Sequence, residues 1–394
     1  MVPRIPYSTQ YIDDADIAAV VEVLRHPVIT GGPWIDRFES AIARYVGARY
    51  AVAVSSGTAA LHIAALAAGV GPGRVAITSC NTFVASANAA RYAGADSHFS
   101  DIEPLTLNMS PAELEKECRR LGKVNLIVPV HFAGLACDMP AIQTIAQEYG
   151  AKIVEDAAHA LGGRYPDDGG RIGNCRFSDM TVFSFHPVKA ITTGEGGLVT
   201  TNDERLYRKL LRLRSHGINK LDDPLIDLKE ARTGDEPNVW YYEMQELGFN
   251  YRMTDIQAGL GLSQFAKLER FLERKRTLAV RYDALWRDHR LVRPAQTQGR
   301  ELNAHHLYVV RIDFRRAPIT RTRLIRSLKE LGIGTQVHYI PASYHPYYRA
   351  LGFEKGRFPA AEAYYRETLS LPLYYGLSDE NQRYVVESVS GLLE

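Results

Sequence analysis

The sequence has few cysteines and almost no net charge. Its four cysteines stand 38, 19 and 38 residues apart and form no CxxC pair, a spacing that offers neither a zinc ribbon nor a disulfide framework. The 47 Lys and Arg residues nearly balance the 45 Asp and Glu residues, so the charge favours neither a nucleic-acid partner nor a membrane surface. The motifs GxxxxGKS/T and GxSxG are absent, which argues against a P-loop and against the nucleophile elbow of α/β-hydrolases.

A targeting segment and a membrane span are also missing from what the sequence shows. Residues 1–14 contain no apolar stretch, so no signal peptide is visible, and we expect a cytoplasmic protein with reduced cysteines. Residues 51–73 carry no charge and are long enough to cross a bilayer. However, the polar run SSGT at residues 55–58 interrupts this stretch, and its apolar content is mostly alanine. We interpret it as strand, turn and helix, and expect no membrane span.

The composition, with 46% hydrophobic and 23% charged residues in 394, is typical of a folded globular protein. Between residues 50 and 201, short apolar runs alternate with segments of helical periodicity, which predicts an α/β domain with a mostly parallel sheet. The predicted strands are residues 50–54, 75–78, 95–99, 124–130, 151–155, 181–185 and 198–201. The predicted helices between them are residues 58–68, 83–92, 110–121 and 139–149.

The pattern changes after residue 251. Thr254 and Gln257 can cap a long helix that we expect to run to Trp286. A strand at residues 306–314, a helix at 319–331 and a strand at 335–339 then predict a smaller α+β domain. We therefore expect an N-terminal arm (1–14), a large domain (15–252), and a linking long helix with a small C-terminal domain (253–394). Residues 221–238 are charged and contain Pro and Gly, which predicts a mobile surface loop.

The run Ser56-Gly57-Thr58 lies where a predicted strand turns into a predicted helix. Free backbone N–H groups and the positive end of the helix dipole make such a turn a site for an anion such as phosphate. Gly57 would let the backbone approach the anion, and Thr58 could add a hydroxyl. An ordinary helix N-cap is the alternative.

Carboxylates end the predicted strand 151–155 and begin the turn after it. In open α/β sheets the carboxyl ends of the strands face the ligand crevice, where Asp156 could keep a heterocyclic nitrogen protonated. Alternatively, Asp156 caps the following turn and His159 is a core residue. The adjacent pair His305 and His306 cannot face one metal ion from a strand, because neighbouring strand residues point to opposite faces, and we expect no metal site.

Lys189 follows another buried strand and precedes a glycine-rich turn. Partial burial lowers the pKa of a lysine and makes it a usable amine nucleophile, although a surface lysine is the simpler reading of any single lysine. The combination favours function, because a phosphate cradle, a carboxylate at a strand end and a lysine after a strand are the parts of a pyridoxal-phosphate (PLP) site.

Three longer motifs carry a family resemblance: SFHPVKAITTGEGG at residues 184–197, RSHG at 214–217 and GFNYRMTDIQA at 248–258. With them the chain, from about residue 5 to its end, resembles the DegT/StrS-type sugar-nucleotide aminotransferases. This resemblance implies the aspartate-aminotransferase fold (PLP fold type I), an α/β large domain with a smaller α+β domain. It also implies PLP as cofactor and a homodimer with shared active sites.

The resemblance also implies a role for each matching residue. Lys189 would anchor PLP and act as the catalytic base, Asp156 would hold the pyridine nitrogen, and His159 would lie near the ring hydroxyl. The remaining cofactor contacts would be Phe83 stacking on the ring, Gly57, Thr58 and Ser184 at the phosphate, and Asn250 from the second subunit.

His159 stands where most of the family has Gln. The pattern DxxHALG at residues 156–162, together with VHY at 337–339, resembles the branch of the family that serves pseudaminic-acid biosynthesis. This likeness implies amino transfer from L-glutamate, leaving 2-oxoglutarate, to C4 of a UDP-linked 4-keto-6-deoxy-N-acetylhexosamine, with a 4-amino-4,6-dideoxy-N-acetyl-altrosamine type product. Tyr7, His338 and Tyr339 are predicted substrate contacts, with ordinary packing as the alternative for the two tyrosines.

Two other functions stay open at this point. An aminotransferase could act on another 3- or 4-keto UDP- or dTDP-sugar, since the motifs do not fix the position that is aminated. A non-catalytic protein that binds PLP or a sugar nucleotide and regulates another process is the second alternative, although Lys189, Asp156 and Thr58 are all present. The related dehydratases carry histidine at the lysine position, so Lys189 argues against that activity.

Overall fold

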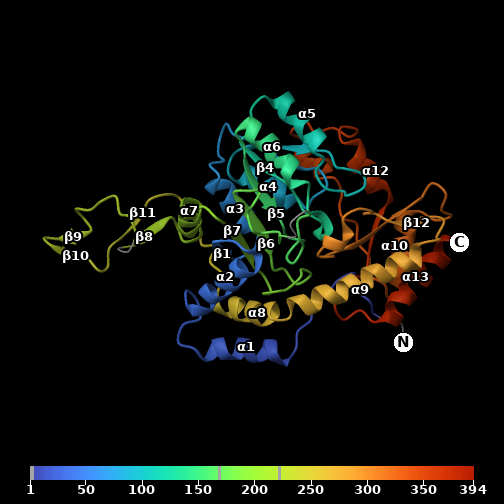
Figure 1. The fold of residues 1–394 in the computed structure, drawn as a ribbon, viewed down its shortest axis with the longest axis horizontal. Helices are drawn as coiled ribbons and strands as arrows, with labels where there is room; N and C mark the ends of the chain where they lie inside the picture. Colours follow the sequence, from blue (N-terminus) through green and yellow to red (C-terminus); the bar gives the residue numbers. More distant parts are fainter. Residues whose placement is uncertain (1–3, 167–169, 221–222) are drawn as a thin grey trace.

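A seven-stranded sheet forms the centre of the larger part of the molecule (Figure 1). The computed structural model describes residues 4–166, 170–220 and 223–394. In the order β1-β7-β6-β5-β4-β2-β3, every strand runs parallel to the others except β7, which pairs antiparallel with both of its neighbours. The strands are β1 (Tyr50–Val54), β2 (Val75–Ser79), β3 (Asp96–Ser100), β4 (Leu126–Val128), β5 (Lys152–Asp156), β6 (Met180–Ser184) and β7 (Gly197–Thr201).

Helices cover both faces of this sheet. Successive residues of a strand point to opposite faces, so strands that are apolar throughout give the sheet two apolar faces to bury. Val52 and Val54 join one buried apolar cluster, whereas Ala51 and Ala53 join another on the opposite face. The first cluster includes residues of α3 (Gly57–Ala67), α4 (Val84–Tyr92) and α7 (Glu204–Arg214). The second includes residues of α2 (Pro33–Val46), α5 (Pro111–Leu121), α6 (Met139–Tyr149) and α8 (Asp255–Phe265). The predicted α/β class with a mostly parallel sheet is confirmed.

The smaller part is built on an antiparallel sheet and a third apolar cluster. Its sheet has the order β12 (Val292–Pro294), β13 (Tyr308–Ile312) and β14 (Thr368–Leu371). The N-terminal arm adds to this part, since Ile5 is fully buried in the same cluster and pairs with Ile333. We keep the boundaries 1–14, 15–252 and 253–394 as a proposal. The helices here are α9 (Leu268–Trp286), α10 (Arg321–Glu330), α11 (Pro346–Arg349), α12 (Pro359–Glu367) and α13 (Asp379–Leu393), with short 3-10 turns η2 (Arg300–Leu302) and η3 (Ala342–Tyr344).

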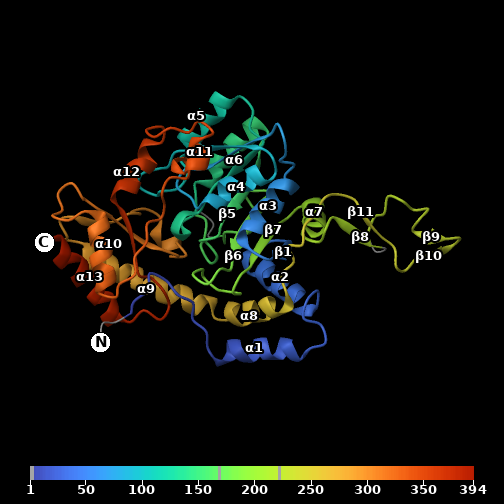
Figure 2. The same cartoon turned by 180° about the vertical axis from the view of Figure 1, so that it is seen from behind.

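The single long helix predicted to run to Trp286 is wrong. Thr254 and Gln257 do form the predicted capping box, but α8 ends at Phe265 and α9 begins at Leu268. The break is where α1 (Asp14–Arg25) docks, and the Nζ of Lys267 lies 2.7 Å from Asp13 and 2.6 Å from Asp16 there. The contact with α1 comes from the other end of the chain, so the local periodicity could not reveal it. Figures 1 and 2 show α9 running on from α8 to the small domain.

Two predicted strands differ from those observed. The strand expected at residues 124–130 is shortened to β4, because Pro129 has no N–H to donate to a neighbouring strand. The strand expected at 335–339 is replaced by a single bridge between Gln336 and Ser370. Beyond that bridge the Nδ1 atom of His338 bonds the Ser370 hydroxyl at 2.7 Å, and His338 and Tyr339 both line a cavity. A regular strand would send these two neighbours to opposite faces.

A ribbon projects from the large domain on the side away from the small domain (Figures 1 and 2). It consists of the antiparallel pair β8 (Ile218–Lys220) and β11 (Tyr242–Met244), with a tip formed by β9 (Arg232–Thr233) and β10 (Glu236–Pro237). The predicted loop 221–238 lies within it, although residues 221–222 fall outside the described part. Exposed apolar side chains gather along the ribbon: Ile226, Leu228, Val239, Trp240, Tyr242, Met244 and Leu247.

The segment 51–73 forms β1, a turn and the alanine-rich helix α3, as predicted. Among the helices of the described ranges, none has the combined length and hydrophobicity that crossing a bilayer requires.

Candidate active site

A cavity of about 640 Å³ opens where the carboxyl ends of β5 and β6 meet the first turn of α3. This is the edge of an α/β sheet at which ligands bind. The cavity brings together segments from the arm to residue 345. All the predicted site residues except Asn250 line it: Tyr7, Gly57, Thr58, Phe83, Asp156, His159, Ser184, Lys189, His338 and Tyr339.

The turn into α3 forms a cradle whose shape depends on glycine. Ser56 caps the helix, because its side chain accepts the Ala59 N–H at 3.1 Å and its carbonyl accepts the Ala60 N–H at 3.0 Å. The N–H groups of Gly57 and Thr58 lie at the positive end of the helix. A Cβ on Gly57 would lie only 2.9 Å from the Cβ of Ser184. A Cβ on Gly197 would lie 2.3 Å from the Ser56 carbonyl oxygen, so β7 can pass this close only as glycine. The cradle fits a phosphate group.

Asp156 ends β5 and is held on both carboxylate oxygens. Ser86 donates its hydroxyl to Oδ2 at 2.6 Å, and the Ala158 N–H donates to Oδ1 at 3.1 Å. Ser86 is itself in contact with the Thr82 hydroxyl at 2.7 Å. The carboxylate is therefore fixed in direction while it lines the cavity. Sequence reasoning missed Ser86, because nothing in its neighbourhood on α4 indicates a partner 70 residues away.

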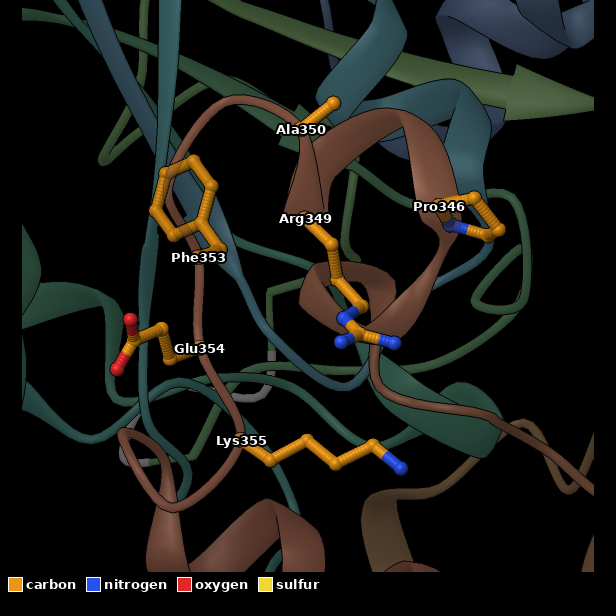
Figure 3. A pocket seen from close by; sticks show the side chains of 6 residues that line it. All are labelled: Pro346, Arg349, Ala350, Phe353, Glu354 and Lys355. Atoms are coloured by element: carbon orange, nitrogen blue, oxygen red, sulfur yellow. The ribbon is translucent and has the colours of Figure 1, made fainter.

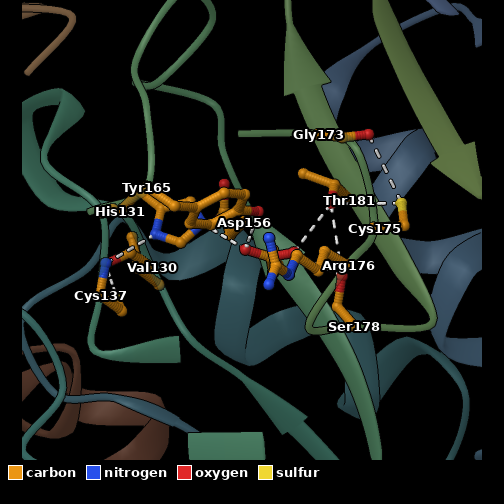
Figure 4. A network of polar contacts seen from close by, with 12 residues as sticks. Val130, His131, Cys137, Asp156, Tyr165, Gly173, Cys175, Arg176, Ser178 and Thr181 are labelled. Carbon is orange, nitrogen blue, oxygen red and sulfur yellow. Dashed lines mark hydrogen bonds and ion pairs between the residues drawn. The ribbon is translucent and has the colours of Figure 1, made fainter. Parts of the chain in front are cut away.

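Glu155, the residue before Asp156, anchors the end of β5, and Figure 4 shows the network of polar contacts here, with His131, Tyr165, Ser178 and Thr181 labelled. The buried carboxylate of Glu155 accepts hydrogen bonds from His131 Nε2 at 2.7 Å and from the Tyr165 hydroxyl at 2.7 Å. His131 Nδ1 accepts the Cys137 N–H at 3.0 Å, so the proton of this imidazole is on Nε2 and is donated to Glu155. The hydroxyls of Thr181, at 3.0 Å, and of Ser178 complete the set of donors.

Burial alone would raise the pKa of Glu155, but the hydrogen bonds from His131, Ser178 and Tyr165 hold it below its ordinary value. The end of β5 is thus fixed by a charged, fully satisfied group directly beside Asp156.

Lys189 reaches the cavity from the turn after β6. Its backbone N–H donates to the His186 carbonyl at 2.9 Å, which closes this turn. Burial lowers the pKa of the Lys189 amine to about 8, although the negative charge of Asp156 opposes the change. At pH 7 about a tenth of a lysine with this pKa is neutral, and that fraction can act as a nucleophile or base.

Two further histidines and a tyrosine share one hydrogen-bonded wall. His159 Nδ1 accepts the Ala133 N–H at 3.3 Å, so its proton lies on Nε2 and is donated to the Tyr339 oxygen at 3.1 Å. Tyr339 is then free to donate its own proton to a cavity ligand. Burial, with the charge of Lys189, holds the pKa of His159 well below its ordinary value, so the ring is neutral. The ring centre of His306 lies 4.2 Å from that of His159, with the two planes tilted by 38°, and its Nδ1 is buried with no hydrogen-bond partner among the described residues.

The remaining predicted residues occupy distinct places. Phe83, with 58% of its surface exposed, presents an aromatic face to the cavity on which a planar ring could stack. Burial lowers the pKa of His338 to about 4, and its ring lies 5.7 Å from that of Tyr7. Asn250 is exposed, pairs with Ser215, and does not line the cavity of its own chain. Sequence reasoning missed several other lining residues: Ser56, Thr82, His186, Glu195, His306, Gln336 and His345.

A second hollow, of about 620 Å³, lies on α11 and the turn that follows it (Figure 3). Its lining includes Arg349, Phe353 and Lys355, and none of the predicted site residues. Within the described ranges, no group of three or more His, Cys, Asp or Glu side chains is arranged to hold a metal ion.

The family model described as DegT/DnrJ/EryC1/StrS aminotransferase matches residues 10–390. The chain belongs to this family. It is a sugar aminotransferase of the aspartate-aminotransferase fold, and PLP is its cofactor. The residues present fit that group, since the glycine-lined cradle, the carboxylate of Asp156 and the amine of Lys189 line one cavity.

The similarity to known proteins extends over nearly the whole chain. The spore coat polysaccharide biosynthesis protein SpsC of Bacillus subtilis is 40% identical over 394 residues, with 99% of this chain and 97% of that protein covered. A UDP-4-amino-4,6-dideoxy-N-acetyl-beta-L-altrosamine transaminase of Campylobacter jejuni is 34% identical over 393 residues, covering 99% of this chain and 98% of its own.

Solved structures agree with this assignment. Helicobacter pylori PseC, an aminotransferase involved in pseudaminic-acid biosynthesis, has a TM-score of 0.88, with 29% identity and 99% of both chains covered. The sugar aminotransferase Spr1654 of Streptococcus pneumoniae, solved in its PLP form, has a TM-score of 0.86, with 30% identity and 99% and 98% of the two chains covered.

A Gly57→Ala substitution tests the cradle. The added Cβ would meet Ser184 at 2.9 Å, and relieving this contact should weaken PLP binding about tenfold or more. The dissociation constant is measured by titrating cofactor-free protein with PLP and following the absorbance. Gly391→Ala on α13 is the matched control, because a Cβ there meets nothing within 4 Å. An unchanged affinity in Gly57→Ala would contradict the assignment of this turn.

A Glu155→Gln substitution tests the anchor of β5. The side-chain NH₂ of the introduced glutamine would replace one carboxylate oxygen and would point at groups that donate hydrogen bonds to that oxygen. We expect the free energy of unfolding to fall by about 3 kcal/mol at neutral pH. The native pKa of Glu155 is below its ordinary 4.5, so its stabilisation is present above that pH and lost as the pH falls through the native value.

The stability difference between wild type and Glu155→Gln should therefore shrink below about pH 4.5. Denaturant unfolding at a series of pH values measures it, with the exposed Glu301→Gln as control. A constant difference across the acid range would show that the charge of Glu155 is not what stabilises the strand.

Proposed function

We propose that this aminotransferase moves the amino group of L-glutamate to C4 of a UDP-linked 4-keto-6-deoxy-N-acetylhexosamine, leaving 2-oxoglutarate. One observation carries the proposal. The two segments behind the resemblance to the pseudaminic-acid branch, 156–162 and 337–339, meet in the cavity through the 3.1 Å hydrogen bond from His159 to Tyr339. The similarity to the Campylobacter jejuni transaminase and to PseC supports the same substrate class.

In this proposal each cavity residue has a separate task. Lys189 would hold the cofactor and, as a free amine, would move the proton at the substrate carbon. Asp156 would accept the N–H of the pyridine ring and favour its cationic form. PLP, when bound, supplies the electron sink that makes the substrate carbon acidic. Gly57, Thr58 and Ser184 would hold its phosphate.

Three further aromatic side chains would surround the pyridine ring of PLP. Phe83, whose side chain is exposed to the cavity, would stack on this ring. His159 would lie near the ring hydroxyl as a neutral imidazole, with its proton fixed on Nε2 by the Ala133 N–H. Tyr339 is oriented by that proton, so its own O–H points to the ligand rather than to the wall.

The same cavity must accept glutamate and a nucleotide sugar in turn. Tyr7 and His338 form the wall next to Tyr339, and we propose all three as substrate contacts. Burial raises the pKa of Tyr7 and lowers that of His338 to about 4, so both side chains are neutral near pH 7. Neutral hydrogen-bonding groups suit sugar hydroxyls, carbonyls and an acetamido group.

A coupled assay with L-glutamate and a panel of 3-keto and 4-keto UDP- and dTDP-sugars tests the function. We expect amination at C4 of the UDP-linked 4-keto-6-deoxy-N-acetylhexosamine, located by NMR, with an equal amount of 2-oxoglutarate. Lys189→Ala should lower turnover about a thousandfold and lose the visible absorbance of the bound cofactor, whereas exposed Lys329→Met should not.

Turnover with dTDP-sugars alone, or amination at C3, would replace the proposal by another keto-sugar substrate. The name of the Bacillus subtilis relative refers to a spore coat polysaccharide and not to the altrosamine product, so the panel includes keto-sugars other than the proposed substrate.

We further propose a homodimer in which Asn250 serves the cofactor site of the neighbouring subunit. The position of Asn250 outside the cavity of its own chain supports this, as do the exposed apolar side chains of the adjacent ribbon, among them Trp240 at 73% exposure.

We also propose a cytoplasmic location. All four cysteines are buried and free, which supports it.

Hybrid dimers test the shared site. Lys189→Ala and Asn250→Ala subunits are each expected to be nearly inactive. When equal amounts are mixed and allowed to exchange, half of the dimers are hybrids with one intact site, so about one quarter of wild-type activity should return. Size-exclusion chromatography of each variant is the control for dimer formation. If stable dimers form and no activity returns, Asn250 does not act across the interface.

A further inference from the structure

Lys275 is a buried lysine without a matching negative charge. It lies on α9, only 4% of its surface is exposed, and its Nζ forms no ion pair or hydrogen bond with any residue of the described ranges. Lys267, two turns earlier, shows the contrast, because its Nζ is paired with Asp13 and Asp16 at 2.7 and 2.6 Å. A buried and unpaired ammonium is unfavourable, since burial removes its hydration without replacing it.

Lys275 lies at a small cavity that Lys189 also lines. Both Lys275 and Lys189 line a small cavity of about 20 Å³ behind the active site. This volume holds about one water molecule. The rest of its lining is uncharged: Thr9, Gln10, Tyr11, Pro187, Ala190, Ile191, Thr192, Gln264, Phe271 and Tyr375. Lys189 also lines the large cavity, so it stands between the two spaces.

The other titratable groups near these two lysines do not neutralise Lys275. Burial lowers the pKa of His305 to about 3 and that of His306 well below its ordinary value, so both rings are uncharged. Arg300 is paired with Asp283. Tyr11 and Tyr375 are the titratable side chains of the arm and of the segment after β14 that face the small cavity.

Asp156 acts on Lys189 from the side of the large cavity, where His159 and His338 are uncharged. Lys275 is therefore the one cation that faces Lys189 from the small cavity among the described residues.

We infer that Lys275 is a positioning residue that increases the neutral, reactive fraction of the Lys189 amine by placing a positive charge behind it. The inference rests on the proposed role of Lys189 as cofactor anchor and base. Two ammonium groups that line one small cavity repel each other, so protonating one makes protonating the other harder. In agreement, burial lowers the pKa of each amine to about 8, and for Lys275 the charge of Lys189 adds to the effect.

Three variants separate this role from a structural one. Lys275→Met keeps the length of the side chain and removes the charge, Lys275→Arg keeps a permanent charge, and Lys329→Met removes a charge from the exposed surface of α10. Cofactor-free protein is treated with acetic anhydride over a range of pH, and peptide mass spectrometry follows the acetylation rate of Lys189. The pH of half-maximal rate should lie near 8 in the wild type.

In Lys275→Met this midpoint should rise by about one pH unit, a tenfold smaller neutral fraction below the midpoint. Lys329→Met should leave the midpoint unchanged, and Lys275→Arg, which stays charged at pH values where Lys275 loses its proton, should leave it unchanged or lower it. The pH dependence of the visible absorbance of PLP-loaded protein should shift in the same direction. The melting temperature of Lys275→Met should not fall, because the substitution removes an unpaired buried charge.

An unchanged midpoint in Lys275→Met, with or without a lower melting temperature, would overturn the inference. These readouts do not depend on the substrate. If Lys189→Ala kept its turnover, the proposed function would fail, whatever the midpoints of the Lys275 variants.

Discussion

The buried carboxylate of Glu155 fixes the point on which the active site depends. Four donors, from His131, Tyr165, Ser178 and Thr181, converge on it inside the protein. Because the next residue of a strand points to the opposite face, a rigid Glu155 determines where Asp156 enters the cavity. A charged group can be kept there only because every donor is in place, so this part of the core specifies one arrangement rather than several.

The parts of the site that lie within one segment could be predicted from the sequence. The strand and helix around Gly57, the strand that ends at Asp156 and the turn that holds Lys189 are all observed, because local periodicity and turn residues determine them. The side chains that orient them could not be predicted. Ser86 meets Asp156, and Lys275 meets the space behind Lys189, only after the chain has folded. The break between α8 and α9 has the same origin, since α1 docks there.

Hydrogen bonding and burial set the protonation states of different groups in the candidate active site. At Glu155, donated hydrogen bonds keep the pKa of the carboxyl group below its ordinary value, and at Asp156 they fix the direction of the carboxylate. Around His159, His306 and His338, burial lowers the pKa of each imidazole and leaves it neutral, and for His159 the Ala133 N–H also fixes the tautomer. The amine of Lys189 lies between these two regions, where burial lowers its pKa and the charge of Asp156 opposes the change.

The N-terminal arm joins the two ends of the polypeptide in one structure. Ile5 is buried among residues of the small domain. Its N–H donates to the Gly332 carbonyl, and its carbonyl accepts the Gly334 N–H. The Leu373 N–H donates to the backbone carbonyl of Tyr7 at 3.0 Å. The arm is synthesised before residues 278–393, whose apolar side chains receive Ile5. The cavity wall containing Tyr7 can therefore form only after these later segments have been made and packed against the arm.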